Sequence, residues 1–146
     1  MTIGLGTDIV EIVRIKKAVE KGGEAFLEKV YTPQEISSYA KRNKSGYSYL
    51  AGRWAAKEAF SKALGCGIGE NCSLSEIDIS ETPSGAPALE LSGNAKKIRR
   101  SSRRKQYTGI YQPRSELRGC HRPAGKISFT APALSDRIDL RGRRSF

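Results

Sequence analysis

The chain has 146 residues, of which 38% are hydrophobic, and it carries a formal net charge of +11. This length fits one domain, or one domain with a tail, around a modest core. Because no apolar run could span a membrane and no secretory signal opens the chain, we expect a cytoplasmic protein without membrane contact. Three scattered cysteines form neither a disulfide framework nor a zinc knuckle, so we expect reduced thiols at Cys66, Cys72 and Cys120.

The positive charge is concentrated at one end of the chain. Residues 1–95 carry a net charge of −1, whereas residues 96–146 carry +12. Arginine usage changes at the same place, from 3 Arg and 8 Lys in the first part to 11 Arg and 4 Lys in the second. The composition therefore predicts a domain at residues 1–98 and a basic tail at residues 99–146.

The first predicted element is a strand over residues 2–12. Alternation places three apolar side chains on one side of it, those of Ile3, Leu5 and Ile9. Gly4 and Gly6 would let another backbone or a ligand approach closely, because they have no side chain.

Two helical segments follow. The first covers residues 14–30 and is broken at Gly22-Gly23. The second begins with a capping box in which Thr32 caps the helix and Glu35 reaches back, and it runs to about Arg42.

The strongest helix signal covers Tyr49–Leu64, with Gly65 as its stop. One stripe of small residues allows close packing, namely Ala51, Ala55, Ala59 and Ala63. A different stripe carries Trp54, Glu58, Ser61, Lys62 and Gly65.

Two short strands are predicted next, at Leu74–Ser80 and Pro87–Leu91, joined by a turn at 82–85 and followed by a helix that starts at Ala95. Residues 99–146 then match no helix or strand template of useful length. We therefore expect an irregular or disordered C-terminal third, with apolar islands at Ile110-Tyr111, Ile127–Thr130 and Ile138–Leu140.

The acids Asp8 and Glu58 allow two interpretations. In one, Asp8 ends a strand or pairs with Arg14, and Glu58 pairs with Lys62 one helical turn later. In the other, the two carboxylates hold a divalent cation, because carboxylate oxygens suit Mg²⁺, and Lys62 meets a phosphate group. The cations Arg53, Lys57 and Lys62 likewise form either a solvated face or a phosphate-binding face.

Three segments resemble one family. The segments GLGTDIVEIVRI at 4–15, LAGRWAAKEAFSKALGCGIG at 50–69 and SGAPAL at 84–89 are similar to those of bacterial holo-acyl-carrier-protein synthase, the small trimeric branch of the 4′-phosphopantetheinyl transferases. The resemblance covers about residues 1–98. It implies an α+β fold with helices packed on a small antiparallel sheet.

The resemblance also implies a reaction and its residues. The family transfers 4′-phosphopantetheine from coenzyme A to a serine of apo-acyl carrier protein and depends on Mg²⁺. Asp8 and Glu58 match its metal ligands, and Glu58 and Lys62 its catalytic residues. The family's stretch that lies along coenzyme A corresponds here to Arg53, Ser61, Lys62 and Gly65. The family's surface that docks the carrier protein corresponds to Arg14, Lys17 and Lys21. Family members form homotrimers, with active sites between neighbouring subunits.

The C-terminal part departs from this family, which ends in a helix and two strands, the first closing on Ser-His. Neither strand is evident after Lys97. Among the DNA sequences that could encode residues 109–119, some give the peptide VYISHEASYAV when they are read one base later. This peptide looks like the missing strand of the family. We therefore hypothesise a single-base change near codons 96–108, and we expect a chain without two core strands to fold poorly.

Two other functions remain open. The chain could be an inactive remnant of the enzyme, or its basic tail could bind nucleic acid or an acidic partner without sequence specificity. No aromatic-interleaved or helix-turn-helix pattern supports sequence recognition, so nucleic acid is not an expected partner.

Overall fold

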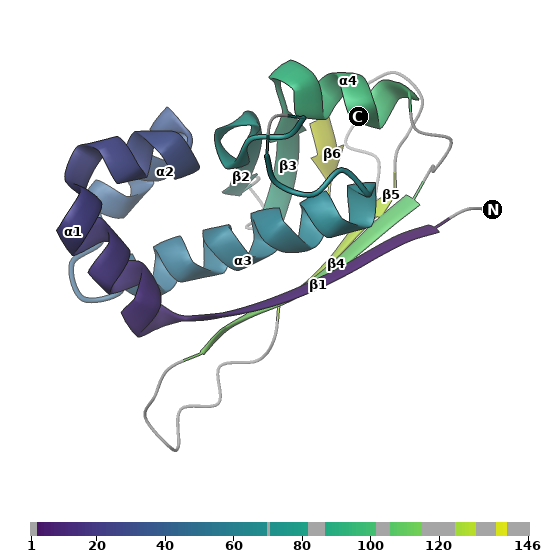
Figure 1. Cartoon of the computed structure of the whole chain (residues 1–146). Coiled ribbons are helices and arrows are strands. Elements are labelled where there is room, and N and C mark those ends of the chain that lie inside the picture. The colour runs from purple at the N-terminus through teal and green to yellow at the C-terminus, as the bar shows by residue number, and fades with distance from the viewer. Residues whose placement is uncertain are drawn as a thin grey trace.

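Four α-helices and two small sheets form the described part of the fold (Figure 1). The computed structural model describes residues 3–69, 71–81, 87–101, 106–114, 125–130 and 137–139. Its elements are β1 (Ile3–Glu11), α1 (Ile12–Val30), α2 (Pro33–Ala40), α3 (Gly46–Leu64), the 3₁₀ turn η1 (Leu74–Glu76), β2 (Ile77–Glu81), β3 (Pro87–Leu91), α4 (Gly93–Ser101), β4 (Gln106–Arg114), β5 (Gly125–Thr130) and β6 (Arg137–Asp139). Among these described elements, no helix is both long and apolar enough to cross a bilayer.

Each sheet has three strands. One has the order β1-β4-β5, in which β1 and β4 are parallel and β4 and β5 antiparallel. The other has the order β2-β3-β6, with antiparallel pairs throughout. The predicted α+β class with helices on antiparallel strands is confirmed, with the addition of one parallel pair. This parallel pair joins β1 to β4, which lies about a hundred residues later in the chain.

Helix α3 lies along β1 and β4, with α1 and α2 at one of its ends (Figure 1). The predicted alanine stripe forms this contact, because Ala51, Ala55, Ala59 and Ala63 are all fully buried. On the strand side, a Cβ atom at Gly4 or Gly6 would overlap the backbone carbonyl of Ala63 or Ala59. The two glycines are therefore what allows the strand and the helix to touch, as predicted.

The opposite face of β1 is left open within this chain. Leu5 is 65% exposed and Ile9 is 67% exposed. Leu5 and Ile9, two of the apolar side chains that the alternation placed together, thus point away from α3, while the glycine face packs against it. A strand face with large exposed apolar side chains is typical of a surface that a partner covers.

Local capping rules predicted the helix ends well. Helix α1 has its kink at Gly23, where φ is 55°. Thr32 and Glu35 form both bonds of the predicted capping box, and Gly65 ends α3 with φ of 84°.

The strand predicted from Leu74 needs correction. Its first residues form a 3₁₀ turn instead, and β2 begins at Ile77.

In the C-terminal third, the described residues form three strands that the sequence analysis did not predict. Strands β4, β5 and β6 coincide with the three apolar islands, and β4 supplies a strand after Lys97 where none was expected. Tyr107 is fully buried, with its ring centroid 5.9 Å from that of Phe60. Pairing between strands uses backbone groups, so β4 forms although its side chains lack a clear alternation. Cys120 and the turn predicted at 82–85 lie outside the described ranges.

A buried ion pair connects the helices to the second sheet. Lys57 is fully buried and Glu35 is 1% exposed, and the Lys57 ammonium lies 2.5 Å from Oε2 of Glu35. Lys57 also donates to the carbonyls of Val30, at 2.9 Å, and Leu74, at 3.0 Å. Oε1 of Glu35 accepts the backbone N–H of Ile79 at 3.1 Å. Lys57 therefore holds the core together, and its predicted place on a solvated or phosphate-binding face is wrong.

Candidate active site

Strand β1 and helix α3 bring Asp8 and Lys62 together. Asp8 follows the two glycines on the face of β1 that packs against α3, since alternate residues share a face. The Lys62 ammonium lies 2.8 Å from Oδ1 of Asp8 and 3.2 Å from the carbonyl oxygen of Thr7. The Asp8 side chain is 16% exposed and that of Lys62 49% exposed. This cross-element pair was not among the predicted pairings, which joined Asp8 to Arg14 and Lys62 to Glu58.

Glu58 lies one helical turn before Lys62 and is half-buried. Burial raises the pKa of its carboxyl above the usual range, and repulsion from Asp8 raises it further. Lys62 and Arg14 oppose this effect because they favour the charged carboxylate. Two acids and two bases therefore form one electrostatic cluster.

The donor set of this cluster suits a divalent cation. Two carboxylates that repel each other gain when a cation lies between them. Among the described residues, no group of three or more His, Cys, Asp or Glu could hold a metal ion. Mg²⁺ accepts such a sparse site, since it keeps several waters and uses one or two carboxylates together with substrate phosphates. Asp8 and Glu58 thus fit the predicted magnesium ligands.

Two other predicted residues adjoin this cluster at the end of α3. The Ser61 side chain is fully buried, and its hydroxyl donates to the carbonyl of Glu58 at 3.1 Å. Gly65 is exposed, and its N–H bonds to the carbonyls of Ser61 and Lys62. Within this chain both residues therefore bond to the backbone at the end of α3, and their predicted contact with coenzyme A stays a prediction.

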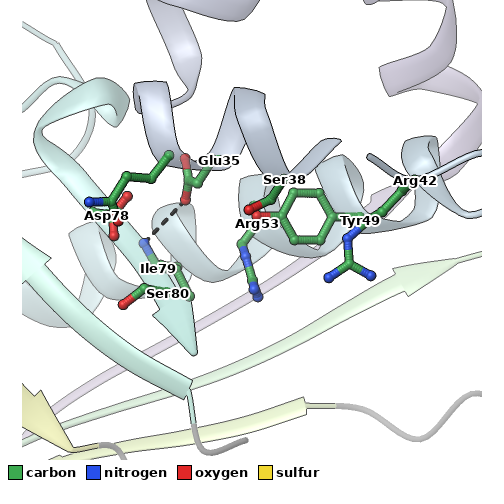
Figure 2. A pocket seen from close by; sticks show the side chains of 9 residues that line it. Glu35, Ser38, Arg42, Tyr49, Arg53, Asp78, Ile79 and Ser80 are labelled. Carbon is green, nitrogen blue, oxygen red and sulfur yellow. Dashed lines mark hydrogen bonds between the residues drawn. The ribbon is translucent and has the colours of Figure 1, made fainter. Parts of the chain in front are cut away.

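Arg53 lies elsewhere, in a polar pocket of about 280 Å³ between α2, α3 and β2 (Figure 2). The ring of Tyr49 lies between two guanidinium groups there, with Arg42 4.4 Å and Arg53 4.6 Å from its centroid. Lys62 comes nine positions after Arg53, which places the two side chains about half a turn apart around the helix at 100° per residue. The structure therefore does not bring Arg53 to the Asp8–Lys62 pair of the same chain.

The predicted docking residues share one face of α1. Arg14, Lys17 and Lys21 are all exposed, and their spacing of three and four residues places them in a row. Ile15 and Val19 on the other face are buried against the core. Arg14 also lies close enough to Glu58 to lower its pKa, so the row begins at the candidate site.

The sequence did not single out Arg42 and Tyr49 as pocket residues. They flank the polar turn before α3, and no periodicity rule says that this turn folds Arg42 back over Tyr49. The only signal was composition, namely an arginine and a tyrosine close to Arg53 in sequence.

The described fold thus places two acids from β1 and α3, a half-exposed lysine and a row of basic residues on α1 close to one another. The family model described as the 4′-phosphopantetheinyl transferase superfamily matches residues 4–115 of this chain. The chain belongs to that superfamily. The match extends past residue 98, where the sequence resemblance had ended, and includes β4.

Within the superfamily, the chain is similar to holo-[acyl-carrier-protein] synthases. That of Ruminiclostridium cellulolyticum is 50% identical over 98 residues, which are 67% of this chain and 73% of the relative. The crystal structure of the enzyme from Neisseria meningitidis aligns with a TM-score of 0.62 and 28% identity, over 92% of this chain and 91% of that one. The Helicobacter pylori enzyme, solved in complex with coenzyme A, aligns with a TM-score of 0.57 and 37% identity, over 73% of this chain and 86% of that one.

Proposed function

We propose that this chain transfers the 4′-phosphopantetheine group from coenzyme A to a serine of apo-acyl carrier protein. The observation that carries the proposal is the cluster of Asp8, Glu58 and Lys62, assembled from β1 and α3 in a member of this superfamily. Transfer between a pyrophosphate and a hydroxyl depends mainly on positioning and charge stabilisation. A pair of carboxylates and a half-exposed ammonium can supply both.

Each residue of the cluster has its own role. Asp8 and Glu58 would hold Mg²⁺, as their mutual repulsion favours. When bound, the ion would offset the negative charge of the phosphate groups of coenzyme A. Glu58 would accept the proton of the carrier serine, since its carboxylate lies beside Lys62 at the site. Lys62 stabilises the phosphate of the leaving adenosine 3′,5′-bisphosphate.

We also propose a homotrimer in which each site is shared between neighbouring subunits. The exposed Leu5 and Ile9 on β1 support an interface on the open face of that sheet. The place of Arg53 away from the Asp8–Lys62 pair supports sharing, because a coenzyme A molecule held by a neighbouring subunit could lie against it. The protein would work in the cytoplasm.

The test is incubation of the purified full chain with coenzyme A, Mg²⁺ and apo-acyl carrier protein, followed by intact-mass measurement of the carrier. We expect the carrier to gain the mass of 4′-phosphopantetheine. An unmodified carrier, in the presence of a chain that elutes as a folded trimer, would favour the inactive-remnant alternative.

Asp8→Asn tests the cation site separately. We expect the dissociation constant for Mg²⁺ to rise about tenfold, equivalent to about 1.4 kcal/mol, because one negative ligand becomes neutral. Competition with Mn²⁺, followed by electron paramagnetic resonance, measures this without turnover. Glu28→Asn removes an exposed acid on α1 and is the matched control. An unchanged affinity in Asp8→Asn would remove Asp8 from the cation site.

The row on α1 predicts an ionic docking surface. Reversing two charges in Lys17→Glu/Lys21→Glu is expected to raise the KM for the acidic carrier protein about tenfold, with the KM for coenzyme A unchanged. The difference should shrink at high salt, because exposed charges are screened. The control is Lys29→Glu, which reverses an exposed charge at the other end of the same helix. Equal effects on both KM values would contradict docking at this face.

A further inference from the structure

The Lys62 ammonium is bound by two oxygen atoms of β1, one of which belongs to a proposed cation ligand. It lies 2.8 Å from Oδ1 of Asp8 and 3.2 Å from the carbonyl oxygen of Thr7. Carboxylate oxygens are also the ligands that Mg²⁺ takes from proteins. The ammonium therefore already neutralises the carboxylate that a divalent cation at this site would need.

The Lys62 side chain can change its partner, in contrast to the nearby Lys57. The Lys62 side chain is 49% exposed, and its ammonium ends a flexible four-carbon stem. A half-exposed ion pair contributes little to stability, so Lys62 can leave Asp8 at small cost. Lys57 is fully buried, and its ammonium donates to two backbone carbonyls besides its pair with Glu35. Of these two lysines, only Lys62 can move to a new partner.

A divalent cation at Asp8 and the Lys62 ammonium compete for one carboxylate. The Asp8 side chain is only 16% exposed, so water screens its neighbours weakly, and two cations on it repel each other. Lys62 also lies one helical turn after Glu58 and lowers the pKa of that carboxyl, so its charge reaches the second acid. A cation held by both acids would therefore meet the Lys62 charge at each of them.

We infer that Lys62 competes with the divalent cation for Asp8, and that its ammonium passes to a phosphate group of coenzyme A when the cation binds. This exchange rests on the proposed function, which supplies both the cation and coenzyme A. A phosphate that takes the ammonium leaves Asp8 open to the cation, and a cation on Asp8 releases the ammonium for a phosphate. Cation and coenzyme A therefore strengthen each other's binding by the same factor, because such linkage is reciprocal.

The first test measures Mn²⁺ binding by electron paramagnetic resonance, with neither coenzyme A nor carrier protein present. In Lys62→Met we expect the dissociation constant to fall about tenfold, because Asp8 loses its competing ammonium. Lys62→Arg keeps a cation that can pair with Asp8, so its dissociation constant should stay within about threefold of the parent's. The control is Lys29→Met, which removes an exposed charge from α1 and should have no effect. Unchanged or weaker binding in Lys62→Met, or equally strong binding in Lys62→Arg, would overturn the inference.

The Asp8→Asn background separates competition for Asp8 from a general effect of charge. There the carboxylate is absent, so adding Lys62→Met should change the Mn²⁺ dissociation constant by less than about threefold. An equal gain in both backgrounds would overturn the inference, because Lys62 would then act on the cluster as a whole. If Asp8→Asn alone left Mn²⁺ binding unchanged, the proposed cation site would fail. If Asp8→Asn weakened binding and Lys62→Met did not strengthen it, only the competition would fail.

The second test follows coenzyme A binding by isothermal titration calorimetry, with and without Mg²⁺, and without the carrier so that no turnover occurs. Mg²⁺ should lower the dissociation constant of coenzyme A in the parent by a factor about tenfold larger than in Lys62→Met. Comparing the ratio within each protein cancels the direct loss of the lysine from the phosphate. Equal factors in the two proteins would overturn the transfer of Lys62 to coenzyme A. A chain that binds both ligands as expected but leaves the carrier unmodified would contradict the proposed function alone.

Discussion

Glu58→Gln is expected to lower kcat/KM for carrier modification about 100-fold or more. Glutamine keeps the size of the side chain but can neither accept the serine proton nor offer a full negative charge to a cation. Removal of a positioned general base alone costs a factor of this order. The measurement is the initial rate of carrier modification by mass, at saturating coenzyme A.

The same substitution should leave the fold as stable or make it slightly more stable. The folded-state pKa of Glu58 lies above its reference value of 4.5, so the folded chain binds more protons at this group than the unfolded chain. Ionisation of Glu58 therefore weakens the fold as the pH rises above about 4.5. Glutamine does not ionise, so the variant should gain stability relative to the parent between acid and neutral pH. Urea unfolding at several pH values measures this difference.

Glu28→Gln is the control, because it removes an exposed acid from α1. It should change neither the rate nor the pH dependence of stability. If Glu58→Gln kept full activity, Glu58 would have no part in the chemistry. If its activity fell because the chain unfolded, Glu58 would be a structural residue instead.

Lys57→Met is expected to lower the free energy of unfolding by about 3–5 kcal/mol, because it leaves the buried Glu35 carboxylate without its counter-ion. Burial already raises the pKa of Glu35, and Lys57 is the group that opposes this rise. Two backbone carbonyls, those of Val30 and Leu74, also lose their donor. Urea denaturation followed by circular dichroism gives the value.

A second variant separates the ion pair from simple loss of packing. Glu35→Gln/Lys57→Met leaves no buried charge and should recover about half of the lost stability, since the unpaired charge is the larger cost. Lys21→Met, on the exposed face of α1, should change stability by less than about 0.5 kcal/mol. A double variant less stable than Lys57→Met would show that packing, not charge, accounts for the loss.

Local rules predicted the elements that carry the site. The capping box at Thr32, the stop at Gly65 and the alanine stripe of α3 depend on neighbours within about four residues, so the sequence reveals them. The close approach at Gly4 and Gly6 was predicted from residue type instead, because only a residue without a side chain tolerates such an approach. The acids at positions 8 and 58 stood out through the family resemblance more than through any pattern.

Longer-range features were missed. No local rule pairs Lys62 with an aspartate 54 positions earlier, or buries Lys57 against Glu35 from another helix. Both depend on how β1, α2 and α3 meet. The C-terminal strands were missed because their apolar islands are short and basic residues surround them, while pairing to β1 and β3 supplies the stabilising bonds.

The parallel β1–β4 pair also affects how the protein is made. On a ribosome, β1 emerges first but has no hydrogen-bonding partner until residues 106–114 follow, nearly the whole domain later. Such a distant closure is slow, and meanwhile both the unpaired backbone edge of β1 and its apolar face with Leu5 and Ile9 are exposed to other nascent chains. A ribosome that stalls or terminates near residue 98 would therefore release an aggregation-prone fragment, although that fragment contains Asp8, Glu58 and Lys62.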